Sequence, residues 1–127
     1  MNLDKKLIDN FVNVTSKAAA ACYKHIGKGD KLIADKAATD SIRKNLNTLN
    51  INGTVVIGEG ELDEAPMLYI GEKIGTGRGP LLDIAVDPLE GTNFAANNLP
   101  GALSVISIAP KGNLFNAPET YMEKIAV

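Results

Sequence analysis

Two short apolar runs constrain the fold of this chain most strongly. Residues 54–57, Thr-Val-Val-Ile, are β-branched throughout, and residues 81–86 are apolar except for Asp83. A continuous run of this kind is typical of a strand covered on both faces. A third strand is expected at residues 102–109. Because helical segments precede and separate these strands, we predict an α/β fold, a layered α+β sandwich.

The helical segments are predicted from apolar spacing and capping residues. Residues 3–26 place an apolar side chain on one face at every turn, and Gly27 is suited to the left-handed residue that ends a helix. Asp30 can cap a second helix that runs to about residue 46. Its buried side is expected to comprise Ile33, Ala37, Ile42, Leu46 and Leu49. A short helix is predicted over residues 63–74, and a turn at 112–113 that leads into strand near 114–115.

Composition narrows the class of protein. The single Cys22 cannot form an internal disulfide, and the N-terminus has no apolar signal-peptide core, so a cytoplasmic protein that contacts no membrane is expected. Residues 1–48 carry a net charge of +4 and residues 49–127 carry −6, with eight acids between Glu59 and Glu90. Such a cluster would repel nucleic acid and would suit hard divalent cations. Composition by itself fits a solvated acidic face better.

Each of the two apolar runs, 54–57 and 81–86, is followed by a carboxylate. Glu59 follows the run 54–57, and Asp87 follows the run 81–86. Ligands of open α/β sheets bind at the carboxyl ends of strands, so two adjacent strands would bring these side chains to one edge. Two carboxylates at such a short distance repel each other unless a cation or a shared proton lies between them. Mg²⁺ or Mn²⁺ fits best, because the site offers only oxygen ligands.

The segment after the second strand can hold a metal and a phosphate together. It reads Asp87-Pro88-Leu89-Glu90-Gly91-Thr92. Pro88 keeps Asp87 extended, Gly91 allows close approach of an anion, and the amides of Gly91 and Thr92 could cradle a phosphate. The simpler alternative is a Pro-Gly turn with solvated acids. The complete run of six residues makes that alternative less favourable.

These six residues resemble the metal-binding motif of the lithium-sensitive, metal-dependent phosphatases, which include inositol monophosphatases and fructose bisphosphatases. Residues 57–73, IGEGELDEAPMLYIGEK, resemble bacterial class II fructose-1,6-bisphosphatase more specifically, as do residues 29–35 and 116–124. The resemblance covers nearly all of residues 1–127, but only the N-terminal part of that family. It implies an N-terminal metal- and phosphate-binding domain over residues 1–127, with the fructose-bisphosphatase/inositol-phosphatase-like fold.

The resemblance also implies roles for individual residues. Metal-site carboxylates are matched by Asp35, Glu59, Asp87 and Glu90. Residues that position and activate the attacking water are matched by Asp63 and Thr92. Contacts to the substrate phosphates are matched by Lys31, Gly91, Thr92 and Tyr121. Glu61, Glu64 and Glu72 are expected to be structural or solvated, and Asp83 is a candidate buried partner of Asp87.

The implied reaction is hydrolysis of the 1-phosphate of fructose 1,6-bisphosphate by metal-activated water in gluconeogenesis, with sedoheptulose 1,7-bisphosphate as an additional implied substrate. The chain ends within an apolar run, so a fragment that binds metal and sugar phosphate without catalysis is the alternative. An inositol or nucleotide phosphatase shares the Asp-Pro motif but not the Gly-Glu-Gly-Glu stretch. The family resemblance suggests a homodimer or homotetramer.

Overall fold

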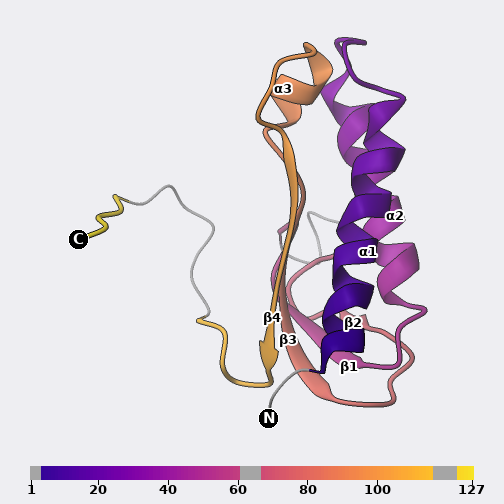
Figure 1. The fold of residues 1–127 in the computed structure, drawn as a ribbon, viewed down its shortest axis with the longest axis vertical. Helices are drawn as coiled ribbons and strands as arrows, with labels where there is room; N and C mark the ends of the chain where they lie inside the picture. Colours follow the sequence, from indigo (N-terminus) through magenta and orange to yellow (C-terminus); the bar gives the residue numbers. More distant parts are fainter. Residues whose placement is uncertain (1–3, 61–66, 116–122) are drawn as a thin grey trace.

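A computed structural model describes residues 4–60, 67–115 and 123–127 of the chain. Its elements in chain order are α1 (Lys5–Tyr23), α2 (Lys31–Leu46), β1 (Asn52–Ile57), β2 (Lys73–Ile74), β3 (Leu81–Glu90), α3 (Thr92–Ala96) and β4 (Leu103–Pro110). The strands form one mixed sheet in the order β2-β1-β3-β4. The two long helices pack together against one face of that sheet (Figure 1). The fold is therefore a layered α/β arrangement, as predicted.

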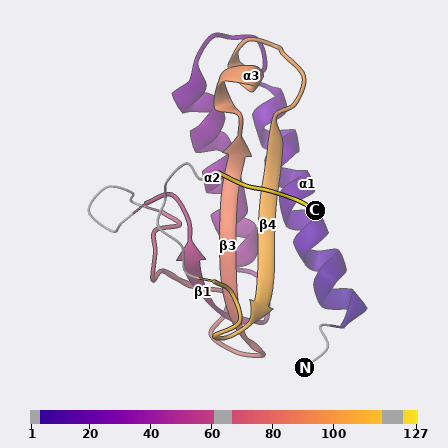
Figure 2. The ribbon, with the colours of Figure 1, turned by 90° about the vertical axis from the view of Figure 1, so that its left-hand side faces the viewer.

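The two apolar runs form the centre of the sheet. β1 pairs with β3 in parallel, and β3 pairs with β4 in the antiparallel sense. Figure 2 shows β1 and β3 running in the same direction, with α3 beyond the end of β3. Ile57 lies opposite Ala85 in the register. Because Glu59 and Asp87 each follow two residues later, the parallel pairing brings both positions to the same edge of the sheet.

The core lies between the sheet and the two helices. Alternate residues of β3, Leu82, Ile84 and Val86, are buried in it, as the two-residue period of a strand requires. They belong to one apolar cluster with side chains of both helices, including Val14, Ala18, Ala34, Ala38, Ile42 and Leu46. Small residues on the facing helix surfaces let the backbones approach closely: the Cys22 thiol donates to the Ala34 carbonyl at 3.3 Å. Cys22 is a core residue.

Helix α2 begins where its sequence predicts. The Asp30 carboxylate accepts a hydrogen bond from the backbone N–H of Ile33 at 3.0 Å, which satisfies one amide of the first turn. The buried side is rotated from the one expected, because Ala34 and Ala38 are fully buried whereas Ile33 is 50% exposed. The small side chains lie in the core, where the Ala34 carbonyl also contacts Cys22 of α1, and the larger isoleucine remains at the surface.

Two predicted elements are wrong. Of the helix expected over residues 63–74, residues 63–66 lie outside the described part, while residues 67–72 form turns and Lys73–Ile74 form strand β2. Leu68 has a backbone φ of 56°, which a right-handed helix does not permit. The strand expected near residues 114–115 is also not formed. The Gly112 N–H there donates to the Asp83 carboxylate at 2.6 Å, so the turn binds back to the sheet.

Candidate active site

A cleft of about 480 Å³ opens at the carboxyl ends of β1 and β3. Its lining comprises Asp35, Ile57, Gly58, Glu59, Val86, Asp87, Leu89, Glu90, Gly91 and Thr92. Six of the nine residues to which the family resemblance assigns a role therefore line one cleft. A second cleft, of about 490 Å³, shares Leu89 with the first, but its lining contains no carboxylate and is mainly apolar. The first cleft is the one equipped for chemistry.

The carboxylates of the cleft come from three elements. Asp35 projects from the second turn of α2, Glu59 follows β1, and Asp87 and Glu90 lie at the end of β3. The strand pairing therefore confirms the prediction that Glu59 and Asp87 meet at one edge. Asp35 joins them because α2 packs across the sheet. No pattern local to residue 35 indicates this position, which only the family resemblance supplied.

Asp87 is electrostatically the most perturbed of these groups. Partial burial raises its pKa to about 6, and a hydrogen bond with Glu90, repulsion from Glu90 and repulsion from Asp35 act in the same direction. The backbone N–H of Leu89 donates to Asp87 Oδ1 at 3.1 Å, which favours the ionised form and opposes those effects. Burial also raises the pKa of Asp35. The cleft thus concentrates negative charge that a proton or a cation would relieve.

The end of β3 turns sharply into α3 at Gly91. This residue has a φ of 77° and immediately precedes Thr92, the first residue of the helix. A Cβ atom at Gly91 would lie 3.0 Å from the ring of Phe94, so both conformation and space favour glycine.

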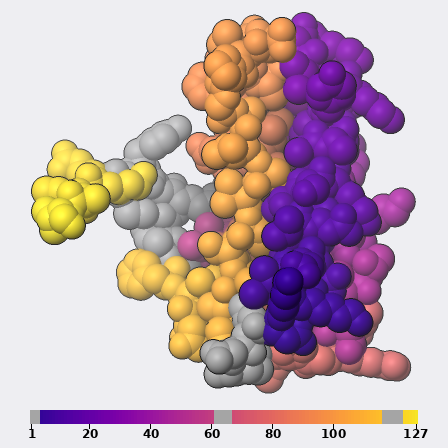
Figure 3. Space-filling view, viewed as in Figure 1, coloured from indigo at the N-terminus to yellow at the C-terminus, as the bar shows by residue number. Residues whose placement is uncertain are grey.

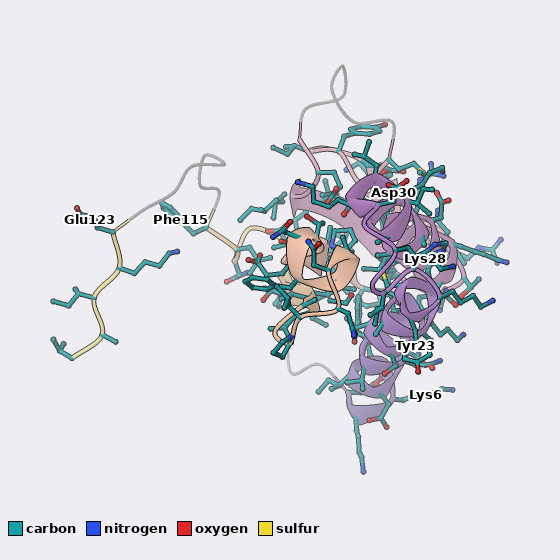
Figure 4. The ribbon with its side chains drawn as sticks, turned by 90° about the horizontal axis from the view of Figure 1, so that it is seen from above. Lys6, Tyr23, Lys28, Asp30, Phe115 and Glu123 are labelled. Atoms are coloured by element: carbon teal, nitrogen blue, oxygen red, sulfur yellow. The ribbon has the colours of Figure 1, made fainter. Side chains whose placement is uncertain are left out.

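The turn between α1 and α2 holds the other end of α3, because the amides of Gly27 and Gly29 donate to the carbonyls of Ala95 and Ala96 at 2.9 and 2.8 Å. Figure 4 looks onto this end and labels Lys28 and Asp30 in the same turn.

The carboxylates of the cleft are chemically suited to a hard divalent cation, but they lie too far apart to bind one together as they stand. The carboxylates that line the cleft offer oxygen ligands alone, which Mg²⁺ and Mn²⁺ prefer. Among the described residues, however, no three carboxylate, imidazole or thiol groups lie close enough together to hold a metal ion as they stand. Asp87 and Glu90 lie close enough for a hydrogen bond, and a cation held by this pair would relieve the repulsion that helps to raise the pKa of Asp87.

The remaining candidates lie elsewhere. Lys31 is exposed in the first turn of α2 and does not line the cleft. Asp63 and Tyr121, with Glu61 and Glu64, lie outside the described residues. Asp83 is buried near the opposite end of β3, where it binds the Gly112 amide, so it is not a partner of Asp87. Glu72 is buried and paired with Arg43, an interaction between positions 29 residues apart that no sequence pattern indicated.

Comparison with known proteins decides the family. The family model described as "Bacterial fructose-1,6-bisphosphatase, glpX-encoded" matches residues 5–127. This chain belongs to that family. The bacterial fructose-1,6-bisphosphatase family therefore accounts for the motif at the end of β3 and for the stretch that follows β1.

Curated relatives agree with this assignment. The chain is 56% identical over 123 residues to fructose-1,6-bisphosphatase 1 class 2 of Escherichia coli strain K12, a match that covers 97% of this chain and 37% of the relative. It is 50% identical over 124 residues to the D-fructose 1,6-bisphosphatase class 2/sedoheptulose 1,7-bisphosphatase of Synechococcus sp. strain CC9902, covering 98% and 37%. The chain thus spans little more than a third of the length of these relatives.

A solved structure supports the fold. An extragenic suppressor from Pyrococcus furiosus superimposes with a TM-score of 0.55 over 84% of this chain and 41% of that protein, at 18% sequence identity. At that identity the likeness concerns the fold alone. In the described part of this bacterial fructose-1,6-bisphosphatase family member, no helix is long and apolar enough to cross a lipid bilayer.

Proposed function

We propose that this chain provides the metal- and phosphate-binding part of a fructose-1,6-bisphosphatase. The proposed reaction converts fructose 1,6-bisphosphate to fructose 6-phosphate and phosphate, as a step of gluconeogenesis in the cytoplasm. The observation that carries the proposal is the contact between the Asp87 and Glu90 carboxylates, in a cleft that Asp35 and Glu59 also line. Family membership supports this substrate class for the cleft.

The proposed cofactor is Mg²⁺ or Mn²⁺, held by Asp35, Glu59, Asp87 and Glu90. When bound, such an ion lowers the pKa of a water molecule and neutralises phosphoryl oxygens. Thr92 lies beside these carboxylates in the cleft and is proposed to orient the attacking water, together with Asp63. Gly91 and Thr92 are proposed to contact a phosphate group, as are Lys31 and Tyr121. Lithium inhibition and a homodimeric or homotetrameric assembly complete the proposal.

The chain's own residues supply positioning and electrostatics. The fixed turn at Gly91 places the backbone that follows β3 at the rim of the cleft, where it can meet an anion without a side chain intervening. The amide of Leu89 holds one oxygen of Asp87 at 3.1 Å and so orients that carboxylate before any ligand arrives. Sedoheptulose 1,7-bisphosphate is a second proposed substrate, supported by the names of the Synechococcus and Prochlorococcus relatives.

The test is phosphate release from fructose 1,6-bisphosphate, sedoheptulose 1,7-bisphosphate and inositol monophosphate. Release is expected from the two sugar bisphosphates only, to require Mn²⁺ or Mg²⁺, and to fall when Li⁺ is added. Asp87→Ala should abolish it, whereas Asp40→Ala, which removes an exposed carboxylate on α2, should retain it. Full release without metal, or from the Asp87→Ala chain, would contradict the proposed metal site.

One specific observation favours a second candidate function, binding without catalysis. The chain covers only 37% of the relatives' length, so groups needed for turnover can lie in the part that it does not match. Mn²⁺ binding, followed by electron paramagnetic resonance of the free ion, separates the two. Tight Mn²⁺ binding that Asp87→Ala removes, without phosphate release, would support the binding function and argue against catalysis by this chain.

A further inference from the structure

We propose that Arg43 and Glu72 form a positioning pair that fixes the Glu59 carboxylate relative to Asp35. This inference rests on the proposed function, because it concerns how two of the proposed metal-binding carboxylates are held. Neither residue lines the cleft, and neither is proposed to touch metal or substrate. Their contacts nevertheless lead through the backbone to Glu59.

The Glu72 carboxylate is buried, and both of its oxygens accept hydrogen bonds. Only 4% of the residue is exposed. The Arg43 guanidinium donates from Nε to Oε1 at 2.6 Å, and the backbone N–H of Leu68 donates to Oε2. A buried charge is costly unless it is paired and hydrogen-bonded, and here both oxygens are satisfied by different parts of the chain. The position of Glu72 is therefore closely fixed.

Leu68 connects this carboxylate to Glu59. While its N–H binds Glu72, its carbonyl accepts a hydrogen bond from the backbone N–H of Glu59 at 3.0 Å. The next turn adds a second link, because the amide of Ile70 donates to the carbonyl of Gly60 at 2.9 Å. The two hydrogen bonds of Leu68 thus connect the Glu72 side chain to the Glu59 backbone.

The backbone of Leu68 is held in an unfavourable conformation at this point. Its φ of 56° is rare for a leucine and persists only where surrounding contacts determine it. The fit is also tight: a Cβ atom on Gly58 would lie 2.0 Å from the Leu68 carbonyl oxygen. Residue 58 must therefore be glycine for the Leu68 turn to reach the end of β1.

Helix α2 carries both parts of the arrangement. Asp35 and Arg43 lie eight residues apart on it, roughly 12 Å along the axis at the usual rise. One rigid helix therefore presents Asp35 directly and, through Arg43, Glu72 and Leu68, holds the segment that presents Glu59. Glu72 is also tied to β1, because its carbonyl accepts from the Val55 amide at 3.0 Å. The spacing of the two carboxylates depends on this connection.

A pair that only stabilised the fold would leave metal affinity of the folded chain unchanged, whereas a positioning pair would not. The test is Mn²⁺ titration of the chain, with free Mn²⁺ measured by electron paramagnetic resonance and folding by circular dichroism. Glu72→Gln and Arg43→Met are each expected to weaken Mn²⁺ binding about tenfold, the lower end of the range for groups that orient metal ligands. Arg43→Lys should recover part of the loss, since a cation is restored without the planar donor group.

The matched control is Asp40→Asn. It breaks the Lys36–Asp40 ion pair, which lies on the same helix at 2.9 Å but is exposed on both sides. Mn²⁺ affinity should be unchanged in this variant. Because the Arg43 side chain is 41% exposed, its replacement tests the inference even if Glu72→Gln fails to fold. Folded Arg43→Met with wild-type affinity would overturn the positioning role, whereas a wild-type chain that binds no Mn²⁺ would overturn the proposed function and this inference with it.

Discussion

The surroundings of Asp87 destabilise the ionised form of its carboxyl group. Its pKa is raised to about 6 by burial and by Glu90, against 3.8 for a free aspartate. The same arrangement that destabilises the metal-free chain prepares the cleft for a cation.

Asp87→Asn is therefore expected to stabilise the metal-free chain at neutral pH. The folded chain holds this proton more tightly than the unfolded chain, so wild-type stability should fall as pH rises from about 4 to about 6. The gain at pH 7 should be about 1 kcal/mol, because solvent screens a half-buried group. Urea unfolding in chelator at several pH values measures it. Asp40→Asn should show no such gain, and an Asp87→Asn chain less stable than wild type at pH 7 would refute the expectation.

Gly91 offers a second test at a single position. Gly91→Ala forces a side chain onto a φ of 77° and brings its Cβ atom to 3.0 Å from Phe94. The matched variant is Gly77→Ala, where φ is 76° and nothing lies within 4 Å. Both should lose roughly 1 kcal/mol of unfolding free energy from backbone strain. Gly91→Ala should lose more, and equal losses in thermal unfolding would show that contact with Phe94 is relieved without cost.

Among the elements, α2 links the fold to the cleft because it carries Asp35 and Arg43. Its first turn depends on the Asp30 cap, just as the first turn of α1 depends on Asp4, which accepts from the Leu7 amide at 2.7 Å. Asp30→Ala and Asp4→Ala should each cost about 1 kcal/mol in chemical unfolding. Only Asp30→Ala should also weaken Mn²⁺ binding, since its turn adjoins Asp35. Equal Mn²⁺ affinity in the two variants would show that the first turn of α2 does not affect the proposed metal site.

These elements also show how far sequence could lead. Asp30 and the two apolar runs predict the start of α2 and the central strands because their signals are local. The helix expected at residues 63–74 is wrong from residue 67 onward, where the contacts of Glu72 with Arg43 and Leu68 hold a turn. Arg43 is 29 residues away, so no local pattern could reveal it. Likewise, residue patterns predicted that Glu59 and Asp87 meet, because both follow strands, whereas Asp35 required the family resemblance.

In the assembled fold, the helices cover one face of the sheet, including one side of β4, and leave the other face of β4 exposed. Strand β4 lies at the end of the strand order, and Leu103 and Val105 on it are 60% and 43% exposed. Figure 3 shows this strand at the surface beside α1. Within the described residues, nothing pairs with its outer edge. A long edge strand with exposed apolar side chains is a template for pairing with another chain.

We therefore expect the isolated chain to self-associate through β4 as its concentration rises. Val105→Lys should shift it toward the monomer, because a charged side chain on an edge strand opposes pairing and the apolar area is reduced. Leu32→Lys is the control: Leu32 is 81% exposed on α2, so the same charge is added away from the sheet edge. Sedimentation velocity over a range of concentrations measures the mass. If both variants shift it equally, net charge rather than β4 governs association; if neither does, the chain is either monomeric or joined through another surface.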